Sequence, residues 1–464
     1  MDGERHTSAV EQAIDGDCEQ AMALLSSAPV SPTDLLNRRL LQADGVGRGS
    51  GGLPPTRIAI VSLLFNWPST GGGIVHTAEL AQFLSAAGYD VCHFYAVYTP
   101  WEMGKVTSSL PYPSVALQFD EAGWNRESII DAYRNAVREF QPDAVIVTDS
   151  WNTKPMLATA VSEFPYYLRL AALECLCPLN NVRLIPGEAG RPIQCHKTQL
   201  ATRDDCVSCV ANNQHAAGPL HAAERQLAMF NDPAHGEELK AAFANAEGVL
   251  AVNPLIGTLC EPYTNHVHVI PSGFDAARFE GLPDIDWEQR PFKLLFAGLV
   301  EEYMKGFHVL FEACSQLYQR RHDFELHVTA EPTNYEAPFL RCRGWQNQGS
   351  LPGLIAECHA LTVPTIAQEA LGRTAVEAMG AARPVIASRI GGLPFTVTEG
   401  LTGLLANPAD ATDLANQIER LIDDPSLAQR LGEAGRQKFI EQHTWDSVIN
   451  RQYRPMFRTL GIGA

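Results

Sequence analysis

The chain has 464 residues, about three times the length of a typical single domain, so two or more domains are expected. Apolar residues make up 45% of the chain and charged residues 19%, which excludes collagen-like and wholly disordered proteins. The 35 Lys and Arg residues against 53 Asp and Glu residues give a formal net charge of −18, which disfavours binding to nucleic acid.

The same composition bears on location. No stretch approaches the roughly 18 uninterrupted apolar residues that span a bilayer. The first residues, with Asp2, Glu4 and Glu11, lack the basic and then apolar order of a signal peptide. We therefore expect a cytoplasmic protein with reduced thiols, for which peripheral contact at the inner membrane face is the most that the acidic charge favours.

Residues 1–55 form the first predicted unit. Small apolar residues recur at helical spacing up to about residue 44, and residues 45–55 are rich in Gly, Ser and Pro. This pattern predicts a helical extension and a linker outside the main core. A docking element and a dispensable extension both fit it.

Residues 56–265 are predicted to form an N-terminal Rossmann-like domain. Short apolar runs alternate with longer amphipathic ones, as in a parallel sheet covered by helices on both faces. The predicted strands and helices are residues 58–64, 74–87, 91–97, 129–140 and 144–148. Residues 174–235 lack strand-like runs and are rich in Cys, Asn, Gln and His, which predicts a large insertion near the end of this domain.

The alternation restarts in residues 266–445, which predicts a second doubly wound domain. Its predicted elements include residues 292–299, 307–318, 324–329, 361–364, 374–381 and 384–388. The stretch 411–460 has the periodicity of two or three amphipathic helices, and residues 446–464 are expected to form a separate tail. The predicted fold class is α/β, with two doubly wound Rossmann-like domains.

Three glycines, Gly71 to Gly73, follow the first predicted strand and open a helix that contains His76. In open parallel sheets such a turn lets backbone amides and a helix N-terminus approach an anion. Glycine runs are also ordinary turn residues. A phosphate-binding loop and a simple flexible turn are therefore about equally supported by this feature alone.

A stronger candidate site follows the predicted strand 361–364. Glu369 lies in the next loop and Glu377 just inside the next predicted helix. Free amides near residues 372–374 can hold a phosphate, while the two carboxylates can accept hydrogen bonds from sugar and ribose hydroxyls. The alternative is a structural pair, because a glutamate near a helix start is favoured by the helix dipole alone.

Lys305 lies at another strand-to-helix junction of the second domain. A lysine there can neutralise a leaving diphosphate, where negative charge develops as a bond between a sugar and phosphate breaks. A solvated lysine at the start of a helix is the alternative.

Together these segments resemble the retaining glycosyltransferases of the GT-B fold, specifically family 4 (glycosyl transferases group 1), whose members use sugar nucleotides. The resemblance covers roughly residues 57–460 and is most specific over residues 364–405. The residues that match the family's acidic signature there are Glu369, Leu371, Gly372, Glu377, Ala378, Met379, Pro384, Val385, Ile386, Ala387, Ser388, Gly391, Gly392, Thr402, Gly403 and Leu404.

The resemblance implies a GT-B architecture, in which the two domains face a central cleft and the tail helix returns to the N-terminal, acceptor-side domain. It implies that Glu369 contacts the transferred sugar, Lys305 the diphosphate and Glu377 the ribose hydroxyls, so Glu369 and Lys305 are the expected catalytic residues. The residues implied to bind the donor are Gly72, Gly73, His76, Leu371, Gly372, Arg373, Thr374 and Glu377.

The activity implied by the resemblance is transfer of a hexose-type sugar with retention of configuration and without a metal in the chemistry. The donor would be a nucleoside diphosphate sugar, and the acceptor a glycan, a lipid-linked sugar or a small molecule. Polysaccharide biosynthesis is the expected setting, and no cofactor other than the donor is expected. No transferable pattern identifies the base, the sugar or the acceptor.

Three positions depart from the family's pattern, one of them near Ala171, where the histidine that many relatives carry has no counterpart. Leu299 follows Gly298 where relatives commonly have Arg, which removes a positive charge from the diphosphate site, and Phe395 stands where a glutamate is common. Arg373 is a candidate to supply the missing charge. These departures leave open a catalytically degenerate protein that binds a nucleotide sugar without turning it over. An epimerase or a phosphorylase on the same fold is a third reading, which the acidic signature disfavours.

Cysteines cluster in the predicted insertion. Cys206 and Cys209 are separated by two residues, a spacing suited to chelating one tetrahedral metal ion. A comparable arrangement of Cys and Pro occurs in some family 4 relatives. We predict a structural zinc ion at Cys177, Cys195, Cys206 and Cys209, because the insertion has little apolar content to hold itself together. Unmetallated buried thiols and a disulfide are the alternatives.

Overall fold

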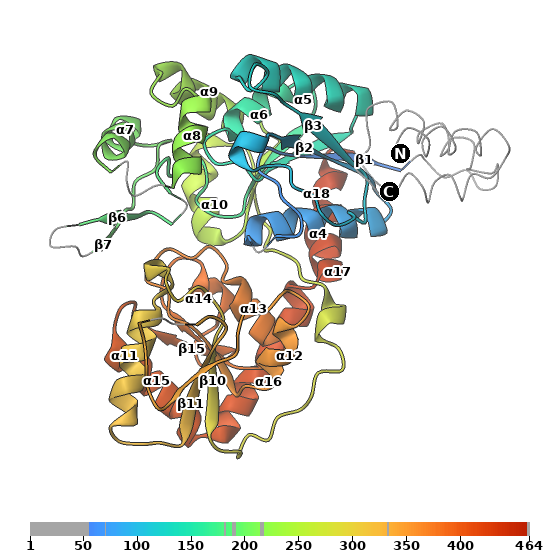
Figure 1. Ribbon diagram of the computed structural model, residues 1–464. Coiled ribbons are helices and arrows are strands. Elements are labelled where there is room, and N and C mark those ends of the chain that lie inside the picture. Colours follow the sequence, from blue (N-terminus) through green and yellow to red (C-terminus); the bar gives the residue numbers. More distant parts are fainter. Residues whose placement is uncertain are drawn as a thin grey trace, which may run out of the picture.

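The computed structural model describes residues 55–69, 71–180, 182–187, 192–213, 218–331 and 334–461. The predicted helical extension lies almost entirely outside these residues. Within them the chain forms two α/β domains, drawn one above the other in Figure 1. This arrangement confirms the predicted fold class.

The first domain is built on a parallel sheet with the strand order β3-β2-β1-β4-β5-β8-β9. Its central strands are buried along almost their whole length, as expected for a parallel sheet with helices on both faces. The strands are β1 (Arg57–Ser62), β2 (Asp90–Val97), β3 (Ser114–Gln118), β4 (Ala144–Thr148), β5 (Tyr166–Leu170), β8 (Gly248–Ala251) and β9 (Val267–Val269). The helices outside the insertion are α4 (Gly72–Ala86), α5 (Arg126–Phe140), α6 (Lys154–Ala160), α9 (Pro233–Ala244) and α10 (Pro254–Cys260).

β9 corrects the predicted boundary between the domains. The periodicity of the sequence places residues from 266 onward in the second domain. In the structure, β9 pairs in parallel with β8, with Val267 opposite Val249. The backbone groups of this strand are satisfied in the first sheet, so the first domain extends to about residue 270.

The second domain has a smaller parallel sheet with the strand order β12-β11-β10-β13-β14-β15. Its strands are β10 (Phe292–Phe296), β11 (Phe324–Val328), β12 (Leu340–Cys342), β13 (Ala360–Val363), β14 (Val385–Ser388) and β15 (Gly403–Ala406). Its helices are α11 (Phe307–Tyr318), α12 (Leu351–Ala356), α13 (Arg373–Gly380), α14 (Leu393–Thr396), α15 (Ala411–Asp423) and α16 (Pro425–Gln442).

The tail crosses back to the first domain, beside the linker that leaves it. The backbone N–H of Phe274 donates to His443 O at 2.8 Å, and Trp445 N–H donates to Phe274 O at 3.1 Å. The tail then continues as α17 (Trp445–Val448), a π-helical turn (Ile449–Tyr453) and α18 (Arg454–Thr459). Trp445, Tyr453 and Phe457 are part of the same buried apolar cluster as Ile58 in β1. Figure 1 shows this red segment running up into the first domain.

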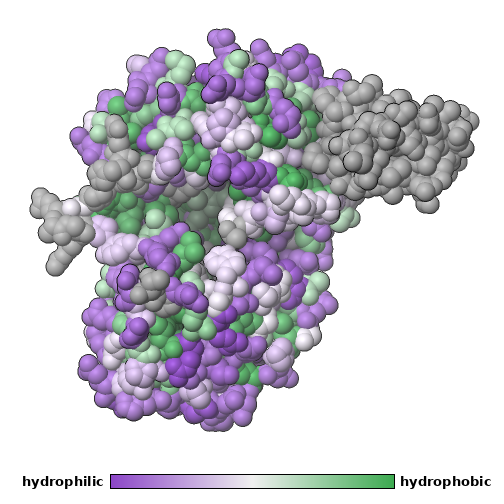
Figure 2. All heavy atoms as spheres, in the orientation of Figure 1, coloured by the Kyte–Doolittle hydropathy of each residue, from purple (hydrophilic) through white to green (hydrophobic). Residues whose placement is uncertain are grey.

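The insertion lies on the other side of the molecule from α17 (Figure 1). It contains an antiparallel hairpin and two helices: β6 (Leu184–Pro186), β7 (Pro192–Gln194), α7 (Arg203–Asn212) and α8 (Pro219–Leu227). Between the domains the surface is hollowed, as Figure 2 shows. No helix among the described residues has both the length and the hydropathy to span a membrane.

Candidate active site

The structure brings the two predicted catalytic side chains together. Glu369 lies in the loop between β13 and α13, and Lys305 ends the 3-10 turn η6 (Tyr303–Lys305) before α11. The Lys305 Nζ lies 3.1 Å from Glu369 Oε2, and the charge of Glu369 raises the pKa of Lys305. The ammonium group is therefore held in its charged form at the edge where the neighbouring strands β10 and β13 end.

The turn that carries Lys305 is fixed to the end of β13 by its backbone. Ile366 N–H donates to Met304 O at 2.9 Å, and Thr365 Oγ1 donates to the same oxygen at 2.8 Å. Gly306 has a φ of 73°, and a Cβ on it would lie 1.9 Å from Pro364 O. Only glycine fits this position, which explains why Lys305 is followed by glycine at the start of α11.

A pair of glycines supports the loop of Glu369 from behind. A Cβ on Gly391 would lie 2.5 Å from Glu369 O, and one on Gly392 would lie 1.8 Å from Ala370 O. The Gly392 N–H donates to Glu369 O at 2.6 Å. Backbone therefore packs directly on backbone here, and the glycine pair of the family's signature has a steric cause.

Helix α13 and the two residues before it contain five of the eight residues that were predicted to bind the donor. Gly372, with a φ of 74°, precedes the helix, and among the described residues no side chain caps its first amides. Free amides at a helix N-terminus, with the helix dipole behind them, favour an anion. Arg373 and Thr374 are half-buried at this end, and Leu371 is buried with its carbonyl accepting from Thr396 Oγ1 at 2.6 Å.

Glu377 is almost fully buried and is oriented by an arginine that the sequence did not single out. Arg278 Nη2 lies 3.1 Å from Glu377 Oε1 and also donates to Gln348. Burial raises the pKa of Glu377, and the positive charges of Arg373 and Arg278 oppose that shift. Arg278 lies 99 positions before Glu377, in the short turn η5 (Ala276–Phe279), so no local pattern connects the two.

Glu79 of α4 links the first domain to this group, and it too went unnoticed in the sequence. Its carboxylate lies 3.5 Å from Arg373 Nη2 and 3.9 Å from Arg278 Nη1, and it accepts a hydrogen bond from Trp445 Nε1 at 3.2 Å. The Arg373 guanidinium also lies 4.3 Å from the centre of the Phe274 ring. Arg373 is thus a positive group held at the junction of the two domains.

The glycine loop of the first domain meets the same junction. A Cβ on Gly72 would lie 2.9 Å from Cδ of Arg373, so the loop and the N-terminus of α13 are in direct proximity. A Cβ on Gly73 would lie 3.0 Å from Asp149 Oδ1. His76, in contrast, is fully buried and stacks on Trp445 with 5.3 Å between ring centres. Burial lowers its pKa, so its neutral ring is part of the packing beneath the loop.

Asp149 is a further polar residue beside the glycine loop, and the sequence did not single it out. It follows β4 directly, is 7% exposed, and its Oδ2 has no hydrogen-bond partner among the described residues. Burial raises its pKa to about 7, while a hydrogen bond with Thr77 opposes the shift. Its position at the carboxyl end of a fully buried strand is the signal that could have found it.

The insertion's cysteines are all free thiols. Within the described parts of the chain, no three His, Cys, Asp or Glu side chains are arranged to hold a metal ion. Burial raises the pKa of Cys206 to about 12 and also raises the pKa values of Cys177 and Cys209. The structure therefore gives no support to the zinc ion predicted at these residues and Cys195.

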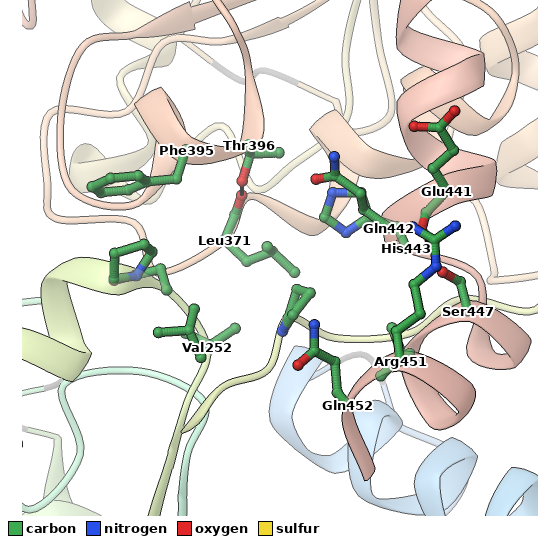
Figure 3. A pocket seen from close by; sticks show the side chains of 15 residues that line it. Val252, Leu371, Phe395, Thr396, Glu441, Gln442, His443, Ser447, Arg451 and Gln452 are labelled. Carbon is green, nitrogen blue, oxygen red and sulfur yellow. Dashed lines mark hydrogen bonds between the residues drawn. The ribbon is translucent and has the colours of Figure 1, made fainter. Parts of the chain in front are cut away.

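A pocket of about 350 Å³ lies behind Leu371, where the linker and the tail cross between the domains. Figure 3 shows Phe395 and Thr396 on one side of it, Val252 on another, and His443 and Arg451 of the returning segment opposite. Phe395 is 48% exposed at its rim. The residues that line this pocket do not include Glu369, Lys305 or Glu377, so it is separate from the cluster around the acidic loop.

Part of the second domain is similar to a known family. Residues 291–424 match the family model of glycosyl transferases group 1. The chain is 30% identical over 211 residues to a glycogen synthase of Mycobacterium tuberculosis, an alignment that covers 43% of this chain and 50% of that protein. The chain thus spans about half the length of this curated relative.

Comparison with solved structures identifies the fold. Sucrose-phosphate synthase from Thermosynechococcus elongatus superposes with a TM-score of 0.60 at 19% identity, covering 87% of this chain and 100% of that one. Anabaena HepE, solved in complex with UDP and glucose, superposes with a TM-score of 0.58 at 16% identity and the same coverage. Both likenesses extend over both domains, and the architecture is that of the GT-B fold.

Proposed function

We infer that this chain, which carries a glycosyl transferases group 1 domain on a GT-B scaffold, is a glycosyltransferase. We propose that it moves a hexose-type sugar from a nucleoside diphosphate sugar to a glycan, lipid-linked or small-molecule acceptor. The observation that carries this proposal is the ion pair between Lys305 and Glu369, placed beside the N-termini of α11 and α13. A carboxylate for sugar hydroxyls and positive groups for a diphosphate are thereby brought within one site.

In the proposed mechanism, the leaving diphosphate is stabilised by Lys305, by Arg373 and by the free amides at the start of α13. In this proposal these groups would lie where negative charge develops as the bond to the sugar breaks. They support a transfer in which the protein itself supplies the positive charge, without a metal ion at the diphosphate. Arg373 would replace the charge that is lost where Leu299 stands.

The sugar and the ribose would be held by the two carboxylates of the signature. Glu369 is engaged with Lys305, which suits hydrogen bonding to sugar hydroxyls better than covalent attack on the anomeric carbon. We therefore propose that the acceptor oxygen attacks from the face that the diphosphate leaves, which retains the configuration. Glu377, oriented by Arg278, would accept hydrogen bonds from the ribose hydroxyls.

The acceptor would approach from the first domain, past the loop of Gly72 and Gly73. The similarity of 43% of the chain to a glycogen synthase favours a glycan acceptor and a role in polysaccharide biosynthesis. The net charge of −18 disfavours anionic lipid, which supports a cytoplasmic protein with peripheral membrane contact at most.

A second candidate function is binding of a nucleotide sugar without turnover. The observation that favours it is Leu299, which is 41% exposed in the loop before Lys305 and adds no charge there. In that case the nucleotide would bind, but the donor would survive in the presence of acceptors.

The first experiment is thermal unfolding of the full chain with UDP, GDP, ADP and dTDP. A ligand that binds only the folded state at 100 times its Kd stabilises it by about 2.7 kcal/mol. We expect one nucleotide to raise the Tm and Glu377→Ala to abolish the rise. The corresponding nucleotide hexose is then incubated with the protein and its release of nucleotide followed. Binding without release supports the second candidate, and no Tm shift with any nucleotide contradicts both.

A further inference from the structure

The insertion reaches the loop that carries Glu369. Arg183 donates from Nε and Nη2 to Oε1 of Gln368, at 3.1 and 2.6 Å. Gln368 Nε2 donates to the backbone O of Cys195 at 3.0 Å, and Gln194 Nε2 donates to Ile366 O. We name these contacts the insertion bridge. They hold two of the three residues that immediately precede Glu369.

Arg183 is built into the bridge rather than lying on the surface. It is 2% exposed, and its partner Gln368 is 5% exposed. The Arg183 backbone has a φ of 49°, a conformation that is uncommon for a residue with a Cβ, and its carbonyl accepts from Cys195 N–H at 2.8 Å. Strained backbone of this kind concentrates at functional positions.

Three of the clustered cysteines lie near this arginine. Burial lowers the pKa of the Arg183 guanidinium, and the neighbouring Cys195, Cys177 and Cys206 oppose the shift. The thiols therefore lie close to Arg183, at the base of the bridge. This gives the cysteine-rich segment a place in the architecture that does not depend on a metal ion.

Two other contacts place the first domain around the same loop. Leu184, next to Arg183, packs against the apolar core of the second domain. On the other side of Glu369, Asn253 at the start of α10 donates from Nδ2 to Ala370 O at 2.5 Å. The residues before and after Glu369 are thus both held by side chains of the first domain, although Glu369 itself belongs to the second.

We propose that Arg183 is a positioning residue for sugar transfer, which acts through Gln368 to hold Glu369 toward the transferred sugar when the insertion is docked on the second domain. This inference rests on the proposed function, which assigns Glu369 to the sugar. The groups assigned to the nucleotide, Glu377 and the start of α13, are not part of the bridge. Loss of the bridge therefore affects turnover more than nucleotide affinity.

The test replaces Arg183 by Met, which keeps most of its apolar length and removes its donors. The matched control is Arg203→Met in the same insertion, because Arg203 donates within the first domain, to Gln199 Oε1 at 2.7 Å and to Phe230 O, and does not touch the acidic loop. Release of nucleotide is measured with water as the acceptor, using the UDP-, GDP- or ADP-hexose that the thermal assay selects. The Kd of the matching nucleoside diphosphate is measured on each variant.

We expect Arg183→Met to lower kcat at least 10-fold and to change the nucleotide Kd less than 3-fold. Gln368→Met removes the bonds from Arg183 and also the bond to Cys195 O, so it should lower kcat at least as much as Arg183→Met. The double variant should be no slower than Gln368→Met, because Arg183 acts through Gln368. Arg183→Lys should recover part of the rate. Equal kcat in Arg183→Met and the wild type, or an equal loss in Arg203→Met, overturns the inference.

A second measurement does not depend on turnover. Hydrogen exchange of the backbone amides in residues 366–371 should be faster in Arg183→Met than in the wild type and unchanged in Arg203→Met. If exchange in Arg183→Met is unchanged, the bridge does not hold the loop and the inference is wrong. A wild-type protein that binds nucleotide but releases none from a donor contradicts the proposed function instead, and the catalytic role of Arg183 falls with it.

Discussion

The two glycine pairs that flank the site, Gly72 and Gly73 in the first domain and Gly391 and Gly392 in the second, are used in different ways. A Cβ on either glycine of the second pair would run into the backbone of Glu369 or Ala370, at 2.5 and 1.8 Å. A Cβ on Gly72 or Gly73 would meet only the side chain of Arg373 or of Asp149, at 2.9 and 3.0 Å. The second pair is therefore required by packing, whereas the first leaves room at a boundary between side chains.

Glycine pairs at two strand-to-helix turns therefore occur for two different physical reasons. The acidic loop of the second domain has its shape because backbone is stacked on backbone, and no side chain can relieve a clash there. The glycine loop of the first domain faces the side chains of Arg373 and Asp149, which can shift. This suits a surface that adjusts when a ligand binds. If this difference is real, the acidic loop of the second domain is rigid and carries the chemistry, whereas the glycine loop of the first domain tolerates substitution.

The largest effect is expected in the acidic loop of the second domain. Glu369→Gln removes the charge that pairs with Lys305 and should lower kcat for donor turnover by about 100- to 1,000-fold, with little change in nucleotide Kd. The measurement is release of nucleotide from the selected donor, with the Kd as control for folding of the site. A loss of less than 3-fold would remove Glu369 from the chemistry.

The next effect compares the glycine pairs directly. Gly392→Ala should lower the free energy of unfolding by at least about 3 kcal/mol, because the backbone of Ala370 must move. Gly72→Ala should lower it by less than about 1 kcal/mol, because only the flexible end of Arg373 must shift. Urea unfolding of both variants measures the two changes. Equal losses of the free energy of unfolding would contradict the distinction between the two glycine pairs.

A smaller effect concerns Asp149 beside Gly73. Its folded-state pKa of about 7 lies above the ordinary value of 3.8, so the folded state binds more protons than the unfolded state between these values. The free energy of unfolding should therefore fall as the pH rises from 4 to 7. The groups whose charges act on Asp149 are Glu174, Lys154 and Arg169.

Asp149→Asn should remove most of this dependence and stabilise the protein at pH 8 by about 1–2 kcal/mol. This is less than the roughly 4 kcal/mol that a three-unit shift represents, because a buried amide also loses its hydration. At pH 4 the variant and the wild type should be similar. Urea unfolding at the two pH values is the measurement, and a variant that is less stable at pH 8 would show that the carboxylate is held charged.

The smallest effect is expected at Arg373, which begins α13 of the second domain and lies against Gly72 of the first. Arg373→Ala should weaken binding of the nucleoside diphosphate about 10-fold, or roughly 1.4 kcal/mol, while the corresponding nucleoside should bind equally well to both proteins. Calorimetric titration with each ligand separates the contribution of the phosphates to binding from that of the nucleoside. Unchanged diphosphate affinity would contradict the role of Arg373 at the phosphates.

Much of this architecture could be predicted because its causes are local. The strand and helix periodicity gives two doubly wound sheets, and the spacing of Glu369, Gly372 and Glu377 places the acidic loop and the helix N-terminus correctly. The pairing of Lys305 with Glu369 follows once both lie at the ends of neighbouring strands.

The rest depends on contacts between distant segments. Arg183 and Gln368 are 185 positions apart, and Glu79 and Arg373 are 294 apart, so no window of sequence contains both partners. β9 is too short to show which sheet it joins, since its apolar pattern fits either. The zinc prediction relied on the spacing between cysteines, whereas among the described residues no three His, Cys, Asp or Glu side chains are arranged to hold a metal ion.

The return of the tail has a consequence for the synthesis of the protein. Trp445, Tyr453 and Phe457 complete the apolar core around β1, yet they are made some four hundred residues after that strand. The first domain therefore cannot close its core until residues 445–457 have left the ribosome. At roughly 5–20 residues per second, the nascent first domain waits about 20–80 seconds with that apolar surface uncovered. A chaperone that binds exposed apolar segments would meet it in that interval.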